Sequence, residues 1–305
     1  METDEITGAE LAADPNTRQR LALSFTPTDI PPRIGEAFLL QFVSAPVPAV
    51  TQERRPLHIG LGLDRQFSSR STCYELRTVT DDAVGLILCE AADRTAAMYT
   101  NAGVPIADPQ TGLTVYSKIH FADPELQMAI SQGMRTGTVP TSTADNTHPA
   151  PGAITVTWCA GPHQRHDDYY DLIPQLAAAL DVVVIADYTT NRWLNAPTTT
   201  QIEPVEPAFA GAYLHYARQL PTTLTTEARE QLARTTAPEA ARCVRPESTG
   251  SSTLTSTTDT IERLAIASAR LELSETVTPA HVETAGRLYD NTVHEFNQKA
   301  TTPEH

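Results

Sequence analysis

The amino-acid sequence predicts an α/β fold, in which a layered core with a parallel sheet precedes an all-helical domain. Up to about residue 190, short apolar runs alternate with helical or loop stretches, which is the pattern of such a core. The run at 181–188 is apolar on both faces, as in a parallel strand covered by helices on both sides. After a Pro-rich connector at 195–207 the apolar periodicity becomes helical.

Five apolar runs predict the strands of the core. They cover residues 56–63, 83–90, 112–121, 153–161 and 181–188. An amphipathic stretch at 34–46 predicts a helix before the first strand. The core is therefore expected over residues 23–194, after an acidic, disordered tail at 1–22.

The helical domain is expected over residues 208–305. Its predicted helices cover 208–220, 225–234, 260–273 and a final helix with Thr278 as its cap and Pro279 at its first position. The expected inward-facing residues are Ile261, Leu264, Ala265 and Ser268, followed by Val282, Ala285, Tyr289, Val293 and Phe296. A polar loop is expected between the helices, at 245–258.

The composition is acidic, with a formal net charge of −15 and a pI of about 4.9. Lys118 and Lys299 are the only lysines among the 22 basic residues, and threonine is abundant. This composition predicts a protein that works in molar intracellular salt, and an acidic mesophilic protein is the alternative. The charge argues against generic DNA binding, which depends on Lys and Arg contacts to phosphates.

The four cysteines are widely spaced, without a C-x-x-C pair, and predict unpaired thiols in a reducing cytoplasm. The first ten residues are acidic and do not form a signal peptide. No apolar run approaches the roughly 20 residues that a membrane helix needs. A soluble, cytoplasmic protein is expected.

The last helices contain the stretch "RLAIASARLELSETVTPAHVETAGRL". It resembles the lid of the minichromosome maintenance (MCM) replicative helicases, written R-L-x-E-A-x-A-R-x-x-L-x-x-x-V-T-x-x-D-A-x-x-A-x-x-L. The preceding "YLHYARQLPTTLTTEAREQL" resembles that family's Y-x-x-Y-A-R segment, followed by P-x-L-T-x-E-A.

Earlier segments resemble the same family in the same order. Together with the lid, the resemblance covers residues 25–295. "EAFLLQFVSA" is similar to A-L-L-L-Q-L-F-G-G, "ELQMAISQGMRTGTV" to A-L-H-E-A-M-E-Q-Q-T-I-S-I, and "DLIPQLAAALDVVVIADYTTNR" to L-P-P-x-L-L-S-R-F-D-L-I-F. The resemblance implies an AAA+ ATPase core plus lid, without the family's amino-terminal DNA-binding domain. ATP and Mg²⁺ are the ligands that it implies.

The positions that resemble the phosphate loop are substituted. Such a loop needs close-approaching glycines, a lysine for the β- and γ-phosphates, and a Ser or Thr for magnesium. Gly62 is kept, whereas Arg65 stands at the second glycine and Ser68 at the lysine. Ser69 survives at the hydroxyl position. The loop therefore lacks its phosphate-binding cation.

The other catalytic positions that the resemblance implies are substituted too. In "GLTVYSKIHFADPEL", Ser117 and Lys118 replace the Asp-Glu pair that holds magnesium and polarises water. Gly161 stands at the polar sensor, Ala179 at the arginine finger supplied in trans, and Ser256 at the lid arginine. Loss of an arginine finger alone costs ~10³ or more in rate. We expect no ATP hydrolysis, no catalytic residue and no cofactor.

Three further features of the sequence concern DNA binding, metal binding and packing. The family's DNA-contacting hairpin carries a lysine, but the corresponding residues 138–152 contain neither lysine nor arginine, so DNA binding is expected to be weak or absent. The "HQRHDD" stretch at 163–168 is interpreted as a polar loop, with a metal site as the less favoured reading. Trp158 and Trp193 are interpreted as packing residues.

These expectations favour a non-enzymatic, MCM-like interaction or regulatory protein associated with DNA replication. Its expected partner is an active MCM or another replisome protein, and a homo-oligomer is also considered. One alternative is a subunit of a mixed ring with residual nucleotide or DNA binding. The other is a decaying copy borne by a mobile element.

Overall fold

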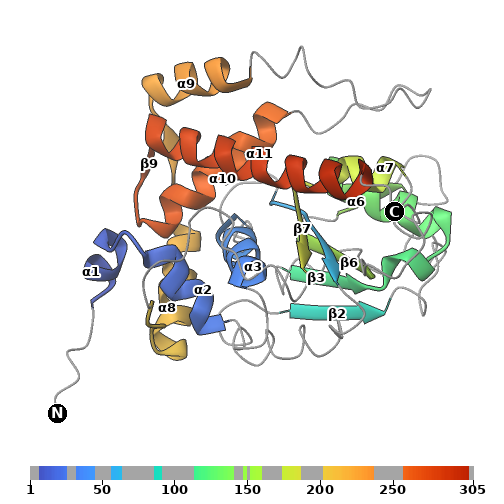
Figure 1. Ribbon diagram of the computed structural model, residues 1–305, viewed down its shortest axis with the longest axis horizontal. Coiled ribbons are helices and arrows are strands. Elements are labelled where there is room, and N and C mark those ends of the chain that lie inside the picture. Colours follow the sequence, from blue (N-terminus) through green and yellow to red (C-terminus); the bar gives the residue numbers. More distant parts are fainter. Residues whose placement is uncertain are drawn as a thin grey trace.

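The computed structural model describes residues 7–25, 32–44, 56–63, 86–90, 113–140, 147–149, 152–159, 174–186, 202–236 and 257–301. In Figure 1 the sheet lies to the right of the view, and the helices of the lid and of the amino-terminal region lie to its left and above it.

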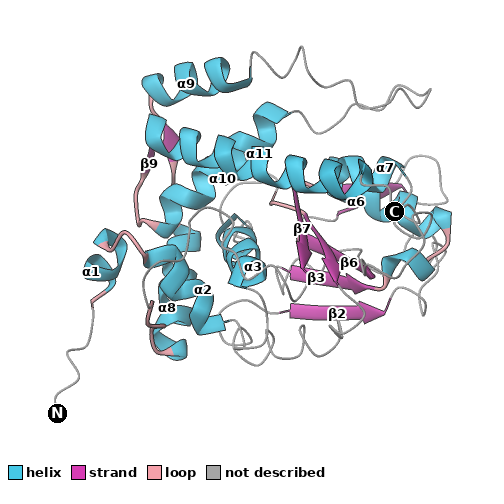
Figure 2. Ribbon diagram, viewed as in Figure 1, coloured by secondary structure: helices cyan, strands magenta, loops and turns pink. Residues whose placement is uncertain are grey.

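The centre of the core is a five-stranded sheet with the order β2-β3-β6-β1-β7, in which every pair of neighbours is parallel. The strands are β1 (Ile59–Leu63), β2 (Leu86–Glu90), β3 (Leu113–Ser117), β6 (Ala153–Cys159) and β7 (Val182–Ala186). Each lies within one of the five predicted runs, and Figure 2 shows them as one group of magenta arrows. The predicted α/β fold with a parallel sheet is confirmed.

Helices cover the sheet on both faces, because successive side chains of a strand point to opposite faces. On one face, Tyr116, Val156 and Trp158 pack with α6 (Pro124–Thr136) and α7 (Pro174–Ala179). On the other face, Val115 and Val184 join a larger core with α3 (Pro32–Ser44) and the lid helices. The interpretation of Trp158 as a packing residue is confirmed, since its side chain is 3% exposed.

The lid contains α8 (Pro207–Gln219), α9 (Thr226–Thr236), α10 (Thr257–Leu271) and α11 (Pro279–Thr301). Two short parallel strands, β8 (Thr223–Leu224) and β9 (Thr276–Val277), join its two halves. The predicted inward-facing residues of α10 are buried, as are Val282 and Ala285 on α11. The side chains of Val293 and Phe296 lie outside the described part. Helix α11 also packs against β7 and thereby covers an edge strand of the sheet.

The predicted disordered tail at 1–22 is wrong from residue 7 onward. Residues 8–13 form α1 (Gly8–Ala13), which begins with a capping box between Thr7 and Glu10, and α2 (Thr17–Phe25) follows. Leu11 and Leu21 are fully buried in the core that includes α3 and the lid. Burial of this apolar surface outweighs the acidic character of the segment, on which the tail prediction was based.

The predicted linker at 195–207 is described from residue 202 onward, where residues 202–206 have no regular structure. Val205 is 6% exposed, and the Ser24 hydroxyl donates to its carbonyl oxygen at 2.9 Å. The Val205 N–H donates back to Ser24 Oγ at 3.0 Å. This part of the linker is therefore fixed to α2.

The lid is joined to the core through one buried carboxylate, Asp181, at the amino-terminal edge of the sheet. Its Oδ2 accepts from the N–H of His58 at 2.8 Å, and its Oδ1 accepts from the Thr260 hydroxyl at 2.8 Å and from Arg263 Nη2 at 2.5 Å. Burial raises the pKa of Asp181, while the Arg263 guanidinium and the His58 N–H oppose that rise. Each of the three partners can donate, so both carboxylate oxygens of Asp181 are satisfied.

A second connection runs through Arg270 on α10. Its Nη1 donates to the carbonyl oxygen of Val43 at the end of α3, at 2.6 Å, and its Nε donates to the Leu220 carbonyl at 3.3 Å. Charge-assisted bonds of this kind are stronger than neutral ones. Together with Arg263, Arg270 fixes α10 against the core at two points.

Candidate functional site

The candidate site lies at the carboxyl edge of the parallel sheet. In open α/β sheets, ligands bind in the crevice outside the carboxyl ends of the strands. Strand β6 lies between β1 and β3, so the ends of these three strands are neighbours along that edge. Gly62, in β1, is buried and pairs with Trp158 on one side and with Ile185 on the other.

Ser117 is the last residue of β3 and pairs with Glu90 of β2. Its side chain is 1% exposed, and its hydroxyl has no hydrogen-bond partner among the described residues. Strand alternation places it on the same face as Leu113 and Val115, the face covered by α3. The residue is therefore a small buried polar group at the edge of the sheet.

Lys118 follows directly and is exposed. Its backbone is left-handed, with φ 53° and ψ 45°, and it precedes a short 3-10 helix at Ile119–Phe121. Its N–H donates to Thr157 Oγ1 of β6 at 3.2 Å. Non-glycine residues adopt this conformation infrequently, because the Cβ approaches the backbone. The chain therefore turns sharply at the point where β3 ends, with an ammonium group facing solvent.

Two aromatic side chains extend this edge beyond Lys118. The rings of His120 and Phe121 have centroids 4.2 Å apart, and Phe121 is 65% exposed. Helix α6 then begins at the cap Asp123, whose carboxylate accepts from the Leu126 N–H at 2.6 Å. It ends at Gly137, which has the positive φ of 69° that glycine adopts most easily.

Ala179 does not lie at this edge. It is the last residue of α7 and is 1% exposed, and two residues later the Asp181 N–H donates to the His58 carbonyl oxygen at 2.8 Å. Since β7 runs parallel to β1, Ala179 lies near the amino-terminal edge, opposite Gly62 and Ser117. Ala179 and the pair of Gly62 and Ser117 therefore lie at opposite edges of the sheet.

Several predicted positions lie outside the described residues. They are Arg65, Ser68 and Ser69 of the loop after β1, Gly161 after β6, and Ser256 immediately before α10. Trp193 and the "HQRHDD" stretch also lie there. Within the described part of the chain, no group of three His, Cys, Asp or Glu residues could hold a metal ion.

The two-stranded hairpin that follows α6 is present. Strand β4 (Thr138–Pro140) pairs antiparallel with β5 (Thr147–Pro149), and Val139 is opposite His148. Neither strand contains a lysine or an arginine. Among the described helices, none is long and apolar enough to cross a membrane.

Comparison with protein families gives a match within the lid. Residues 209–293 match the family model described as the MCM AAA-lid domain. The carboxyl-terminal domain belongs to the MCM lid family. The matched residues include most of α8, all of α9 and α10, and much of α11, so the predicted MCM resemblance is confirmed for the lid.

The fold of the whole chain is similar to that of a full-length MCM homologue from Methanopyrus kandleri. That crystal structure is 21% identical, with a TM-score of 0.64, and the match covers 94% of this chain and 60% of the homologue. The two chains thus share a fold in which a core with a parallel sheet is followed by a helical domain. No curated protein matches the chain.

Proposed function

We propose that this chain is an ATPase-inactive, MCM-like protein that acts in DNA replication through protein contacts. The proposal rests on one observation at the end of β3, the strand that resembles the family's acidic strand. There the buried Ser117 hydroxyl and the exposed Lys118 ammonium stand where the resemblance implies a carboxylate pair.

The chemistry of these two side chains argues against magnesium-dependent hydrolysis. Mg²⁺ prefers oxygen ligands, above all carboxylates, and it keeps near-ideal octahedral geometry. A neutral hydroxyl supplies no charge, and an ammonium group repels the metal. The substitutions at Ser68 and Ala179 remove the cations that would stabilise the phosphoryl group from either side of the site.

The interaction role is supported by the contrast between this edge and the lid. Thr260 and Arg263 of α10 donate to Asp181, and Arg270 donates to the Val43 carbonyl oxygen, so these contacts between lid and core involve none of the nucleotide-site positions. A folded lid and core preserve the outer surfaces of an MCM-like module. An active MCM, or another replisome protein, is therefore the proposed partner.

The first test is a pull-down of the tagged chain from host extract in high-potassium buffer, with mass spectrometry of the proteins recovered. We expect MCM or other replisome subunits. Recovery of the chain alone would remove the main support for a replication partner.

The second test measures ATP hydrolysis and does not depend on partner binding. Phosphate release by the purified chain is expected at background, and Ser117→Asp combined with Lys118→Glu is expected to restore none, because Ser68 and Ala179 remain. Turnover in either protein would contradict the proposed inactivity. Raised ATP turnover after addition of the chain to an active MCM would instead favour a subunit of a mixed ring.

The acidic, lysine-poor composition supports a further part of the proposal, which is adaptation to molar salt. Net charge of one sign destabilises a compact chain by self-repulsion, and salt screens that repulsion. We expect the unfolding midpoint to rise between dilute buffer and molar KCl. A protein equally stable in both would contradict the adaptation and leave the acidic mesophilic alternative.

A further inference from the structure

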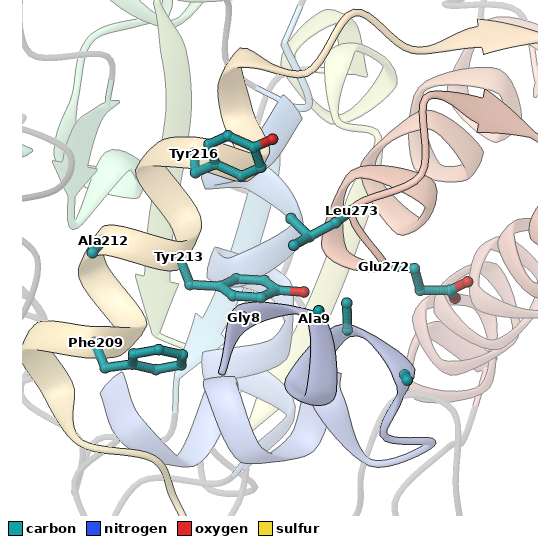
Figure 3. Close-up of a pocket in the computed structure, with 10 residues that line it drawn as sticks. Gly8, Ala9, Phe209, Ala212, Tyr213, Tyr216, Glu272 and Leu273 are labelled. Carbon is teal, nitrogen blue, oxygen red and sulfur yellow. The ribbon is translucent and has the colours of Figure 1, made fainter. Parts of the chain in front are cut away.

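Two cavities lie against the lid, and helix α1 forms part of the wall of both. The larger, of about 630 Å³, lies between α1 and α8, which lines it with Phe209, Tyr213 and Tyr216 (Figure 3). The smaller, of about 390 Å³, is lined by the start of α2 and by the lid helices α10 and α11. Ala12 and Ala13 of α1 line both cavities, as does Glu272 on the lid side. The two cavities are therefore adjacent, and the end of α1 lies where they meet.

Helix α1 itself contributes little buried surface to the fold. Leu11 is its one buried residue, whereas Ala9, Glu10 and Ala13 are exposed. Its side-chain hydrogen bonds lie within its own capping box, between Thr7 and Glu10. Segments with few buried apolar contacts open at a lower cost in free energy than the packed core does. The first helix is therefore the part of this region that opens most easily.

Helix α2, by contrast, is anchored on both sides of the boundary between core and lid. Leu21 is fully buried, and Ser24 is hydrogen-bonded to the connector before α8. Arg18 Nη1 lies 3.5 Å from Oε1 of the buried Glu36 on α3, and Arg18 Nη2 donates to Ser268 Oγ on α10 at 3.1 Å. None of these contacts involves α1, so α2 keeps its position when α1 leaves.

The turn between the two helices fixes the point at which α1 can pivot. The Asp14 carboxylate accepts from the Asn16 N–H at 2.8 Å and from Arg20 Nη1 at 2.9 Å, which holds Asp14 on α2. Its backbone is extended, with φ −73° and ψ 124°, so α1 ends there. The Thr17 hydroxyl reaches the carbonyl oxygens of both Leu11 and Asp14, and it keeps a partner when Leu11 moves away.

We propose that α1 is a latch that controls access to a cleft on the lid. When Leu11 leaves its buried position, α1 pivots at Asp14 while α2 stays on the core. The lid walls of the two cavities then form one continuous cleft, because Glu272 belongs to both of them. With α1 docked, this cleft is divided and partly covered. The inference does not depend on the loss of ATPase activity or on the identity of the replication partner.

Hydrogen exchange of the full chain, followed by mass spectrometry, tests the latch in the wild-type protein. Peptides from residues 8–14 are expected to exchange about a hundredfold faster than peptides from residues 18–25, because α1 opens without α2. Equal protection of the two helices would show that they open as one unit, and it would overturn the proposal.

Two matched substitutions separate opening of α1 from a general loss of stability. Leu11→Ala and Leu21→Ala each truncate a fully buried leucine of the same core. Leu11→Ala should accelerate exchange in α1 far more than in α2 and α10, whereas Leu21→Ala should accelerate it in α2 and α3 as well. Thr7→Val removes the capping box and is the milder variant with the same expected effect as Leu11→Ala. Circular dichroism first verifies that each variant is folded. Equal acceleration of α1, α2 and α10 in Leu11→Ala would overturn the latch.

Access to the cleft is measured by maleimide labelling of Thr284→Cys, at a partly buried position that lines the smaller cavity. Peptide mass spectrometry distinguishes this thiol from the four native cysteines. Combination with Leu11→Ala should make the labelling several-fold faster. Glu283→Cys, at the exposed neighbouring position on α11, is the control and should be labelled equally fast with or without Leu11→Ala. Unchanged labelling of Thr284→Cys would overturn the proposed control of access.

Discussion

The junction between lid and core and the carboxyl edge of the sheet differ in how their polar groups are partnered. At the junction, Asp181 accepts three hydrogen bonds, and Arg263 also donates to the Pro56 carbonyl oxygen at 3.1 Å. At the edge, Ser117 has no partner among the described residues, and Lys118 faces solvent. Buried polar groups need partners to be tolerated, so the junction has an organised polar network, whereas the buried Ser117 hydroxyl at the edge is left unsatisfied within the described part of the chain.

This difference between junction and edge predicts which of the two regions contributes more to the stability of the fold. A buried ion pair does not have to add net stability, but removal of one member leaves a charge buried and unpaired. The junction should therefore be sensitive to single substitutions. Substitution of Ser117 should be tolerated, because its hydroxyl has no partner among the described residues.

The largest effect is expected at Asp181. Asp181→Ala leaves the Arg263 guanidinium, the Thr260 hydroxyl and the His58 N–H without their acceptor, and should lower the free energy of unfolding by ~3–5 kcal/mol. Urea denaturation measures it. Glu283→Ala, an exposed acid on α11, is the control and should stay within ~0.5 kcal/mol. Equal stability of the two variants would abolish the contrast between junction and edge.

The next effect compares two hydroxyls, one from each region. Thr260→Val removes a donor to a buried carboxylate, and should cost ~1.5–3 kcal/mol. Ser117→Ala removes a buried hydroxyl that has no partner, so it should be neutral or stabilising by up to ~1 kcal/mol. Both are read from urea denaturation. A clear loss of stability in Ser117→Ala would mean that this hydroxyl has a partner after all.

A smaller effect is expected at Lys118, because its backbone is left-handed. Lys118→Gly removes the Cβ that disfavours this conformation and should raise the free energy of unfolding by up to ~1 kcal/mol, offset in part by the flexibility of glycine. Lys118→Ala keeps the Cβ and is the matched control. Equal thermal midpoints for the two variants would show that the backbone at residue 118 is not strained.

The smallest effect is expected for the pH dependence of stability that comes from the hydrogen bond between Glu272 and His281. Since the hydrogen bond lowers the pKa of Glu272 from its ordinary 4.5, its stabilisation is present above that value and is lost as the pH falls through the lower folded pKa. Solvent screens this half-exposed pair, so the difference between wild type and Glu272→Gln should stay below ~1 kcal/mol. Unfolding midpoints across the acid range test it, and a difference independent of pH would contradict the assignment.

Much of the fold could be predicted because local patterns repeat what tertiary packing requires. The run at 181–188 is apolar on both faces, and β7 lies between helices and a neighbouring strand as that pattern requires. The period of α10 places Ile261, Leu264, Ala265 and Ser268 inward, where all four are buried. The amino-terminal tail was predicted wrongly, because the few apolar residues of α1 and α2 acquire their significance only against α3 and the lid.

For the candidate site too, part could be predicted from the sequence and part is visible only in the structure. Sequence resemblance pointed to Ser117 and Lys118, but only the structure shows that one is buried without a partner and the other turns in a left-handed conformation. The spacing of Phe209, Tyr213 and Tyr216 is visible in the sequence, but the pocket that they line together with α1 is not, because α1 lies in the segment predicted to be disordered.

By itself, the sequence determined the five strands of the core, the helices of the lid and the acidic character, since each depends on local composition and period, and its motifs carried the resemblance to the MCM lid. The tertiary structure decided which residues meet across large separations in the chain. Asp181 pairs with Arg263 and α1 faces α8 because burial of apolar surface brings these elements together, and burial is a property of the whole fold rather than of any one segment.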